Sequence, residues 1–315
     1  MKKVVILVAL IFLFPLISSQ LTITINQQPA EVYSLGDIIS VPLTIKTTVD
    51  TSGFFNMDVV CNNSQMNFYK NPFYIFTGEE KKIESYLLLT ENIIGELKGT
   101  CKIIASLGPD SALTNQFKIS DLIIINSIFG KSEFSPGENV LIIGEATKEN
   151  SKAAVGLIEF SIAENEGIFL NKTQNIINGT FSINVSFPKD MKAGAYLLRL
   201  NVYEKDIQEK ITNKGSLNKN IRILQVPTSL GIISETRQVE PGTNIKVKSI
   251  LYDQTGEKIV APSSLTIKNK NNQIIGQKTI ATDEFVEFPI AKNESPSTWK
   301  IIAESEKLST ESFFT

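Results

Sequence analysis

The side chains that most enzymes use for proton transfer and metal binding are scarce in this chain. None of its 315 residues is histidine. Histidine titrates near neutral pH, supplies the base in Ser-His-Asp and Cys-His catalysis, and is the commonest metal ligand. The sequence therefore excludes these mechanisms, and we expect no catalytic residue, no metal site and no cofactor.

The two cysteines, Cys61 and Cys101, are the strongest candidates for a covalent role. Two thiols alone cannot complete a structural zinc site, which needs four ligands. In an exported chain such a pair typically forms a disulfide, and closing a loop of about forty residues contributes about 3–4 kcal/mol in the chain-entropy model. We expect this disulfide, and two free thiols are the alternative.

Weaker motifs are explained by composition. Ser-x-x-Lys, the nucleophile motif of penicillin-binding enzymes, occurs without its companion motifs at Ser186/Lys189, Ser216/Lys219 and Ser297/Lys300. A glycosidase needs two carboxylates about 5–10 Å apart. The densest acidic group in the middle of the chain is Glu159, Glu164 and Glu166. We expect these three where a strand gives way to a turn, so we interpret them as solvated surface.

Five Asn-x-Ser/Thr sequons are candidate glycosylation sites, each expected in a turn or on a strand face. Their asparagines are Asn62, Asn171, Asn178, Asn184 and Asn293. A chain rich in Asn, Ser and Thr also produces several sequons by chance, and Pro296 weakens the last. The cluster from Asn171 to Asn184 is the strongest candidate.

The N-terminus has the pattern of a secretory signal peptide. Lys2 and Lys3 precede an uncharged, almost wholly apolar run over 4–17, which is too short to cross a bilayer comfortably, and small residues follow. We expect cleavage near Ser19 and an extracytoplasmic protein, secreted or at the cell surface. An uncleaved membrane anchor and, less favoured, a buried strand or helix are the alternatives.

The charge of the chain does not favour a polyanionic partner. Without Lys2 and Lys3 the chain carries 29 basic and 33 acidic side chains, a net charge of −4. Only three of the basic residues are arginine, whose planar guanidinium group binds phosphate and guanine through paired hydrogen bonds. We therefore expect no nucleic-acid partner.

Short strands must position these residues, because apolar and polar residues alternate along the chain and no helical stripe is found. A Gly turn leads into such a strand three times, at Gly36, Gly137 and Gly242, spaced 101 and 105 residues apart. Late in each unit, another expected strand contains a large or sulfur-containing residue: Cys101, Tyr196 and Trp299. Two landmarks kept in order predict a tandem array.

The expected fold is therefore all-β, with tandem immunoglobulin-like β-sandwiches. The expected boundaries are 1–19 for the signal peptide, then 20–125 with the disulfide, 126–225 and 226–315. The joins are short and rich in Ile and Val, with no Gly/Ser linker, which suggests modules stacked end to end. The first module is the most aromatic, from Phe54 to Phe76. Core packing explains most of these rings, and a carbohydrate- or protein-binding face is the alternative.

The turns at Gly137 and Gly242, with Gly179-Thr180-Phe181 and Gly194-Ala195-Tyr196, resemble tandem immunoglobulin-like domains of prokaryotic surface proteins, including macroglobulin-type and invasin-type repeats. The composition is also similar to that of exported proteins of small-genome archaea. The resemblance is better in the second and third modules than in the first. It implies β-sandwiches and does not indicate an activity. The macroglobulin thioester motif, Gly-Cys-Gly-Glu-Gln, is absent.

The leading hypothesis is a non-enzymatic exported protein of the cell surface or envelope, acting as a structural spacer or as an adhesion or binding module. Its partner would be a surface protein or glycan, and an uncleaved signal or a segment beyond Thr315 would tether it to a membrane. The alternative is the non-catalytic accessory region of a longer extracytoplasmic hydrolase or protease. A self-contained glycosidase is a third, weaker hypothesis.

Overall fold

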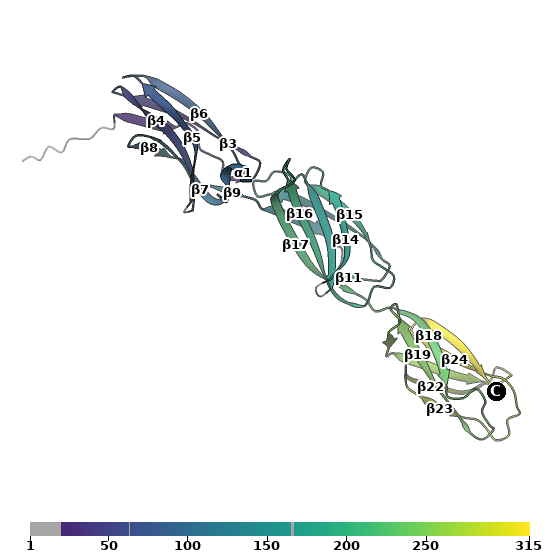
Figure 1. Ribbon diagram of the computed structural model, residues 1–315. Coiled ribbons are helices and arrows are strands. Elements are labelled where there is room, and N and C mark those ends of the chain that lie inside the picture. The colour runs from purple at the N-terminus through teal and green to yellow at the C-terminus, as the bar shows by residue number, and fades with distance from the viewer. Residues whose placement is uncertain (1–19, 63, 165–166) are drawn as a thin grey trace, which may run out of the picture. The chain divides into compact units, whose positions relative to one another are not determined.

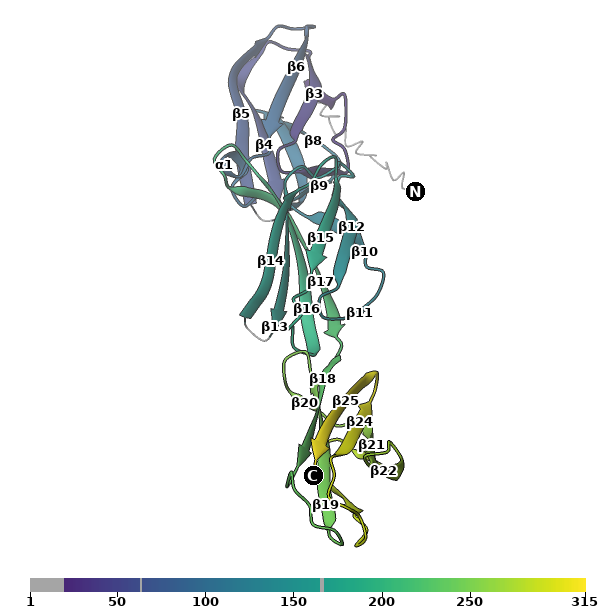
Figure 2. The ribbon, with the colours of Figure 1, turned by 90° about the vertical axis from the view of Figure 1, so that its right-hand side faces the viewer.

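The computed structural model describes residues 20–62, 64–164 and 167–315, and they form an all-β protein (Figures 1 and 2). The expected signal peptide, residues 1–19, lies outside the described residues. Contacts divide the chain into two compact units. One consists of Met1–Ile124, Ala146–Gly156 and Val202–Gly215, and the other of Ile125–Glu145, Leu157–Asn201 and Ser216–Thr315.

The first sandwich has two sheets, with strand orders β1-β3-β6 and β2-β9-β7-β4-β5, and β8 pairs with β7. Its elements are β1 (Leu21–Ile25), β2 (Val32–Ser34), β3 (Ile38–Thr47), β4 (Thr51–Cys61), β5 (Ser64–Ile75), β6 (Glu80–Leu88), α1 (Glu91–Ile94), β7 (Gly99–Leu107), β8 (Asp110–Leu113) and β9 (Phe117–Ser120). Both sheets contribute to one core, to which β3 gives Ile39, Val41 and Leu43, each 0% exposed. The alternation seen in the sequence therefore marks the buried face of β3.

The second sandwich has sheets in the orders β10-β12-β15 and β11-β17-β16-β13-β14. Its strands are β10 (Ile123–Ile128), β11 (Glu133–Phe134), β12 (Asn139–Lys148), β13 (Leu157–Glu164), β14 (Gly167–Asn175), β15 (Thr180–Ser186), β16 (Gly194–Lys205) and β17 (Ile211–Ile223). In β15, Phe181, Ile183 and Val185 are buried and the residues between them are exposed, as the sequence predicts.

The third sandwich has sheets in the orders β18-β19-β20, with β23 on β19, and β22-β21-β24-β25. Its strands are β18 (Pro227–Ser234), β19 (Asn244–Asp253), β20 (Lys258–Ile259), β21 (Pro262–Lys268), β22 (Ile274–Ala281), β23 (Val286–Pro289), β24 (Trp299–Ser305) and β25 (Leu308–Phe314). A hairpin with its tip at Asn271-Asn272 joins β21 to β22, and Asn272 has a positive φ of 59°.

The same Gly turn opens each sandwich. Gly36, Gly137 and Gly242 all have positive φ, at 93°, 76° and 87°, where a side chain would be strained. Each also donates one equivalent backbone hydrogen bond, to the carbonyl oxygens of Leu89, Pro188 and Ile290 respectively (2.8, 3.1 and 3.1 Å). The first landmark of the repeat therefore has one backbone geometry in all three places.

The second landmark is a core position. Cys101, Tyr196 and Trp299 lie in β7, β16 and β24, and each is less than 5% exposed. Among the described residues, no helix has the length and the apolar character that crossing a membrane requires.

Candidate functional site

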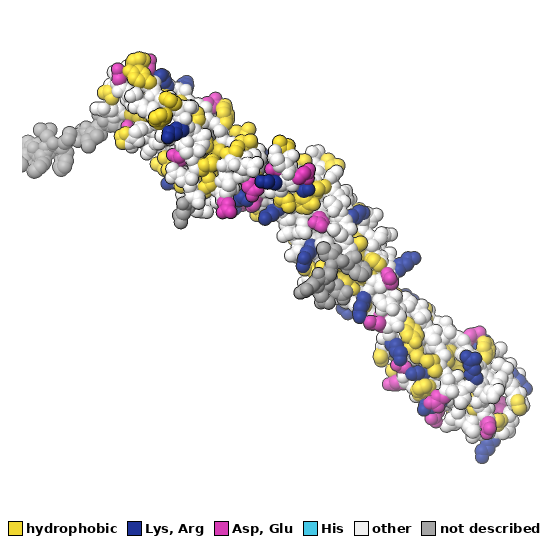
Figure 3. Space-filling view, in the orientation of Figure 1, with side chains coloured by type: hydrophobic (Ala, Val, Ile, Leu, Met, Phe, Trp, Pro, Cys, Tyr) yellow, Lys and Arg dark blue, Asp and Glu magenta, His cyan; other side chains and the backbone are white. Residues whose placement is uncertain are grey.

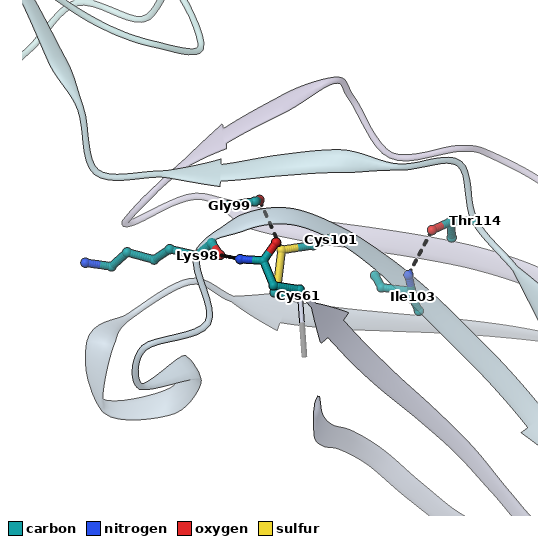
Figure 4. The surroundings of a disulfide bond; sticks show 7 residues. Cys61, Lys98, Gly99, Cys101, Ile103 and Thr114 are labelled. Carbon is teal, nitrogen blue, oxygen red and sulfur yellow. Dashed lines mark hydrogen bonds between the residues drawn. A yellow bond between two sulfur atoms is a disulfide. The ribbon is translucent and has the colours of Figure 1, made fainter. Parts of the chain in front are cut away.

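Cys61 and Cys101 form a disulfide between β4 and β7 (Figure 4). The two residues face each other directly in the antiparallel ladder, and their Cα atoms are 4.0 Å apart. Both are 2% exposed. The bond therefore crosses two strands that already pair, and it is part of the core of the first sandwich.

The five sequon asparagines are all exposed in the structure. Asn62 has a positive φ of 51° and donates a hydrogen bond from its side-chain amide to the Lys98 carbonyl (3.4 Å). Asn171 lies in β14 and Asn184 in β15, and Lys172 Nζ donates to the Asn184 carbonyl oxygen at 2.6 Å. Each of these two strands is the edge strand of its sheet. Asn171 and Asn184 therefore lie on two different sheet edges of the second sandwich.

No catalytic arrangement is found among the candidate acids and Ser-Lys pairs that the structure describes. Glu159 lies inside β13, not at its end as expected, and accepts a hydrogen bond from Asn171 (3.1 Å). Glu166 and the side chain of Glu164 lie outside the described residues. Lys300 forms an ion pair with Glu311 (3.0 Å), and the described residues contain no group of three or more acidic or cysteine side chains suited to a metal ion.

The aromatic residues of the first sandwich divide between core and surface. Phe55 is 0% exposed and contacts the rings of Tyr69 and Phe73. Phe54 and Phe76 are instead more than half exposed, and hydrophobic side chains are visible on the surface of this sandwich (Figure 3). Core packing therefore accounts for only part of the aromatic content.

The most elaborate polar site is a network in the first unit, which we call the first joint. It brings the Gly turn of the first sandwich against residues of 146–156 and 202–215. Asn213 is 0% exposed and donates from one amide nitrogen to the Leu35 carbonyl (3.0 Å) and to Glu204 Oε2 (2.7 Å). Glu204 is 8% exposed, accepts from the backbone N–H of Val155 (2.7 Å) and lies 3.4 Å from Lys148 Nζ.

Asp37 is the acidic centre of the first joint. Its carboxylate accepts hydrogen bonds from Lys152 (2.6 Å), Asn150 (2.7 Å) and the backbone N–H of Ser34 (2.8 Å). Burial acts to raise the pKa of Asp37, but hydrogen bonds from Lys152 and the Ser34 backbone outweigh it, so the pKa lies below its ordinary value. The carboxylate is therefore the stable form in the joint.

A glycine allows the backbone to pack closely in the same region. A Cβ atom on Gly215 would lie 2.0 Å from the carbonyl oxygen of Ile123, where no side chain fits. Close by, Leu122 forms a parallel bridge with Lys214, whose N–H donates to the Asp121 carbonyl (2.8 Å). The segment that leaves the first sandwich is therefore paired along β17.

A second joint lies in the other unit, at the hairpin 254–257. Gln254 donates to the carbonyls of Met191 (3.0 Å) and Leu224 (3.2 Å) and accepts from the Val226 backbone N–H (2.9 Å). Beside it, Lys192 forms an ion pair with Glu257 at 2.8 Å. One amide side chain thus satisfies three backbone groups where the second sandwich ends.

The acid at the base of this hairpin is buried. Asp253 is 2% exposed and accepts hydrogen bonds from Gln225 (2.9 Å), the Thr255 backbone and hydroxyl (2.8 and 2.7 Å) and the Glu257 backbone (3.0 Å). Burial acts to raise the pKa of Asp253. The hydrogen bonds from Gln225 and Thr255 outweigh this and lower the pKa to about 2.

Sequence reasoning missed both joints. Asn213 and Leu35 are 178 residues apart, and Asn150 and Asp37 are 113 apart, so no local pattern links them. The short joins without Gly/Ser linkers were the sequence signal that pointed toward them.

Comparison with known proteins gives remote structural likenesses only. No family model matches the chain, and no curated protein matches it. The chain is similar to native Escherichia coli alpha-2-macroglobulin (TM-score 0.28, 11% identity, 94% of this chain and 22% of that one). It is likewise similar to a Salmonella alpha-2-macroglobulin mutant, with a TM-score of 0.29 and 11% identity over 94% of this chain and 23% of that one. A Listeria innocua beta-glucosidase matches 31% of this chain and 16% of its own length, with a TM-score of 0.25 and 16% identity. The chain thus spans about a fifth to a quarter of the macroglobulin chains that it matches.

Proposed function

We propose that this chain is a non-enzymatic exported protein of the cell surface or envelope, built from modules 20–125, 126–225 and 226–315. Its role is that of a structural spacer that carries binding faces. The observation that supports this most is the first joint, where a fully buried asparagine and a nearly buried glutamate connect distant parts of the chain. A spacer needs such joints, because a flexible linker lets neighbouring modules rotate freely.

The energetics of the first joint favour a fixed connection. Asn213 and Glu204 are desolvated, so separating them from Leu35 and Val155 leaves buried polar groups without partners. Each unsatisfied buried group costs about 1–3 kcal/mol. The joint is therefore stable only when its hydrogen bonds are made together.

Export is supported by the N-terminal pattern and by the disulfide. The apolar run over 4–17 follows two lysines, and the Cys61–Cys101 bond persists best in an oxidising compartment. We propose an extracytoplasmic location, with cleavage near Ser19. The intact mass of the chain recovered from the host tests this: a mass that retains residues 1–19 contradicts cleavage and favours a membrane tether.

We also propose that Asn171, Asn178 and Asn184 carry glycans, because all three are exposed and two lie on edge strands. Glycans there would cover backbone groups that otherwise attract strands of other chains. Mass spectrometry of peptides from the exported protein tests this. Asn175 is exposed in the same strand but outside any sequon, so it is the internal control.

The experiment that tests the function combines location with binding. Intact cells are treated with protease, and the purified exported chain is screened against envelope proteins and glycans. We expect protease to cut the chain on intact cells, and we expect an envelope partner whose binding is weakened by Phe54→Ala or Tyr74→Ala but not by Phe313→Ala. Phe313 is 52% exposed in the third sandwich and is the matched control. Protection of the chain inside intact cells, or enzymatic turnover of a screened glycan, contradicts the proposal.

A further inference from the structure

One buried carboxylate of the first joint contacts both an amine and an amide. Oε2 of Glu204 lies 3.4 Å from Lys148 Nζ and accepts a hydrogen bond from the side-chain amide of Asn213 (2.7 Å). The three residues come from three strands, β12, β16 and β17. A nucleophile, a proton carrier and a carbonyl group that a nucleophile can attack therefore lie around one oxygen atom.

These three side chains are largely shielded from water. Those of Lys148 and Glu204 are 15% and 11% exposed, and Asn213 is 0% exposed. The backbone at Gly156 covers Glu204 closely, since a Cβ atom on that glycine would lie 3.1 Å from the Glu204 Cα atom. Burial disfavours the charged forms of an amine and of a carboxylate, so it favours a proton transfer from Lys148 to Glu204 that leaves both neutral. A neutral lysine amine is a nucleophile, whereas the ammonium ion is not.

The Lys148 amine is loosely held, and the Asn213 amide is incompletely satisfied. The 3.4 Å between Lys148 and Glu204 is longer than a charge-assisted hydrogen bond, which measures about 2.7–2.9 Å. The amide oxygen of Asn213, Oδ1, is buried and has no hydrogen-bond partner among the residues that the structure describes. An unsatisfied buried oxygen destabilises the unreacted amide. The amine, on its flexible four-carbon stem, can therefore leave Glu204 and reach the amide carbon.

We propose that a covalent isopeptide bond between Lys148 Nζ and Asn213 Cγ closes the first joint after the chain has folded. Glu204 accepts a proton from the Lys148 ammonium group, and the neutral amine attacks Cγ. The Nζ–Cγ bond forms and the Cγ–Nδ2 bond breaks. Two protons leave Nζ through the Glu204 carboxylate and end on the departing nitrogen, which leaves as ammonium. Nothing is oxidised or reduced, and before the reaction Asn213 acts through its hydrogen bonds alone.

A second set of amine, carboxylate and amide in the same joint serves as an internal control. The carboxylate of Asp37 accepts from Lys152 through one oxygen (2.6 Å) and from Asn150 through the other (2.7 Å). The Lys152 side chain is 62% exposed, so water stabilises its ammonium form, and the short contact holds it at the carboxylate. We therefore expect one cross-link in the joint, at Lys148, and none at Lys152.

The cross-link would join the two sheets of the second sandwich. Lys148 ends β12, which belongs to the sheet β10-β12-β15, and Asn213 lies in β17 of the other sheet. Hydrogen bonds and packing can open and close again, whereas these two positions would separate only if a covalent bond broke. The inference concerns this joint alone and does not depend on the proposed spacer role.

The test is peptide mapping by mass spectrometry of the purified exported chain after reduction of its disulfide. We expect a branched peptide that joins the segments around Lys148 and Asn213 and that weighs one ammonia less than the two separate peptides together. Lys148→Arg keeps the charge but removes the nucleophilic amine, and Glu204→Gln removes the proton carrier, so neither variant should contain the branched peptide. Lys152→Arg is the matched control and should contain as much of it as the unchanged chain.

The unchanged chain alone gives the decisive result, so a variant that fails to fold does not affect it. Separate peptides of full mass around Lys148 and Asn213 overturn the proposal. A branched peptide that persists in Glu204→Gln, or one that forms at Lys152 instead, overturns it as well. None of these masses bears on export or surface location, so the proposed function is tested separately.

Discussion

Replacing Asp253 with asparagine removes one buried charge and changes little else. The substitution Asp253→Asn keeps the size of the side chain and keeps an oxygen that accepts from the Thr255 and Glu257 backbone N–H groups. It loses the negative charge that strengthens these bonds and the bond from Gln225. The hairpin of the second joint is therefore expected to form with a smaller stabilisation.

The magnitude follows from the pKa of the carboxyl group. In the folded protein the pKa of Asp253 is lowered from 3.8 to about 2, and this difference corresponds to about 2 kcal/mol of stability. Because the folded-state pKa is the lower one, the stabilisation is complete above pH about 4 and is lost as the pH falls toward about 2. The free energies of unfolding of the two proteins should therefore differ by about 2 kcal/mol at neutral pH and converge in acid.

The assay is urea unfolding followed by tryptophan fluorescence at several pH values. Trp299 is the single tryptophan and is 4% exposed in the core of the third sandwich, so the signal reports this sandwich. Asp283, whose pKa is also lowered to about 2 by hydrogen bonds from Lys248 and Lys258, titrates equally in both proteins and cancels in the difference. Glu284→Gln, at an exposed carboxylate, is the control. A difference that is absent at neutral pH, or constant down to about pH 2, refutes the reasoning.

Three further outcomes are expected. Replacing Cys61 and Cys101 with serine should lower the unfolding free energy of the first sandwich by about 3–4 kcal/mol. The unfolding transition of the third sandwich, followed by Trp299 fluorescence, should stay unchanged. An equal loss of stability in both sandwiches contradicts their independent unfolding. Gly215→Ala should expose the segment around Ile123 to protease, because its Cβ would lie 2.0 Å from a carbonyl oxygen, whereas Gly231→Ala, with 3.9 Å of space, should not. Asn213→Ala should lower the free energy of unfolding in denaturant by about 1–3 kcal/mol. Asn213→Asp should lower it further, because it places a second carboxylate beside Glu204. Equal stability of the unchanged chain and both variants excludes a structural role for this amide.

Local rules made the fold predictable. Gly36, Gly137 and Gly242 were recognisable because a positive φ restricts the residue type, and the alternation in β3 and β15 follows from one buried face per strand. The expectation that Glu159 lies at a strand end was wrong, because β13 continues for five more residues to Glu164. Polar residues inside a strand give no sign of where its pairing stops.

The joints could not be predicted by the same rules. Asn150, Asn213 and Gln254 look like ordinary polar residues of turns and strands, and only the folded chain brings each to its acceptor. Their hydrogen bonds depend on contacts between distant parts of the chain, which leave no periodic trace in a single sequence. The disulfide was predictable because the chain contains only two cysteines.

The two joints differ in the sign of the charge on their hairpins, and this favours the order in which the sandwiches occur. Lys152 and Glu257 occupy the same position in the hairpins 149–152 and 254–257. Lys152 forms an ion pair with Asp37, and Glu257 forms one with Lys192. If the second and third sandwiches were exchanged, a glutamate would face Asp37, and like charges would repel. Recombination between the repeats would therefore lose both ion pairs, although every sandwich in the resulting chains could still fold. The repeats thus share a turn backbone but carry different charges at their joints.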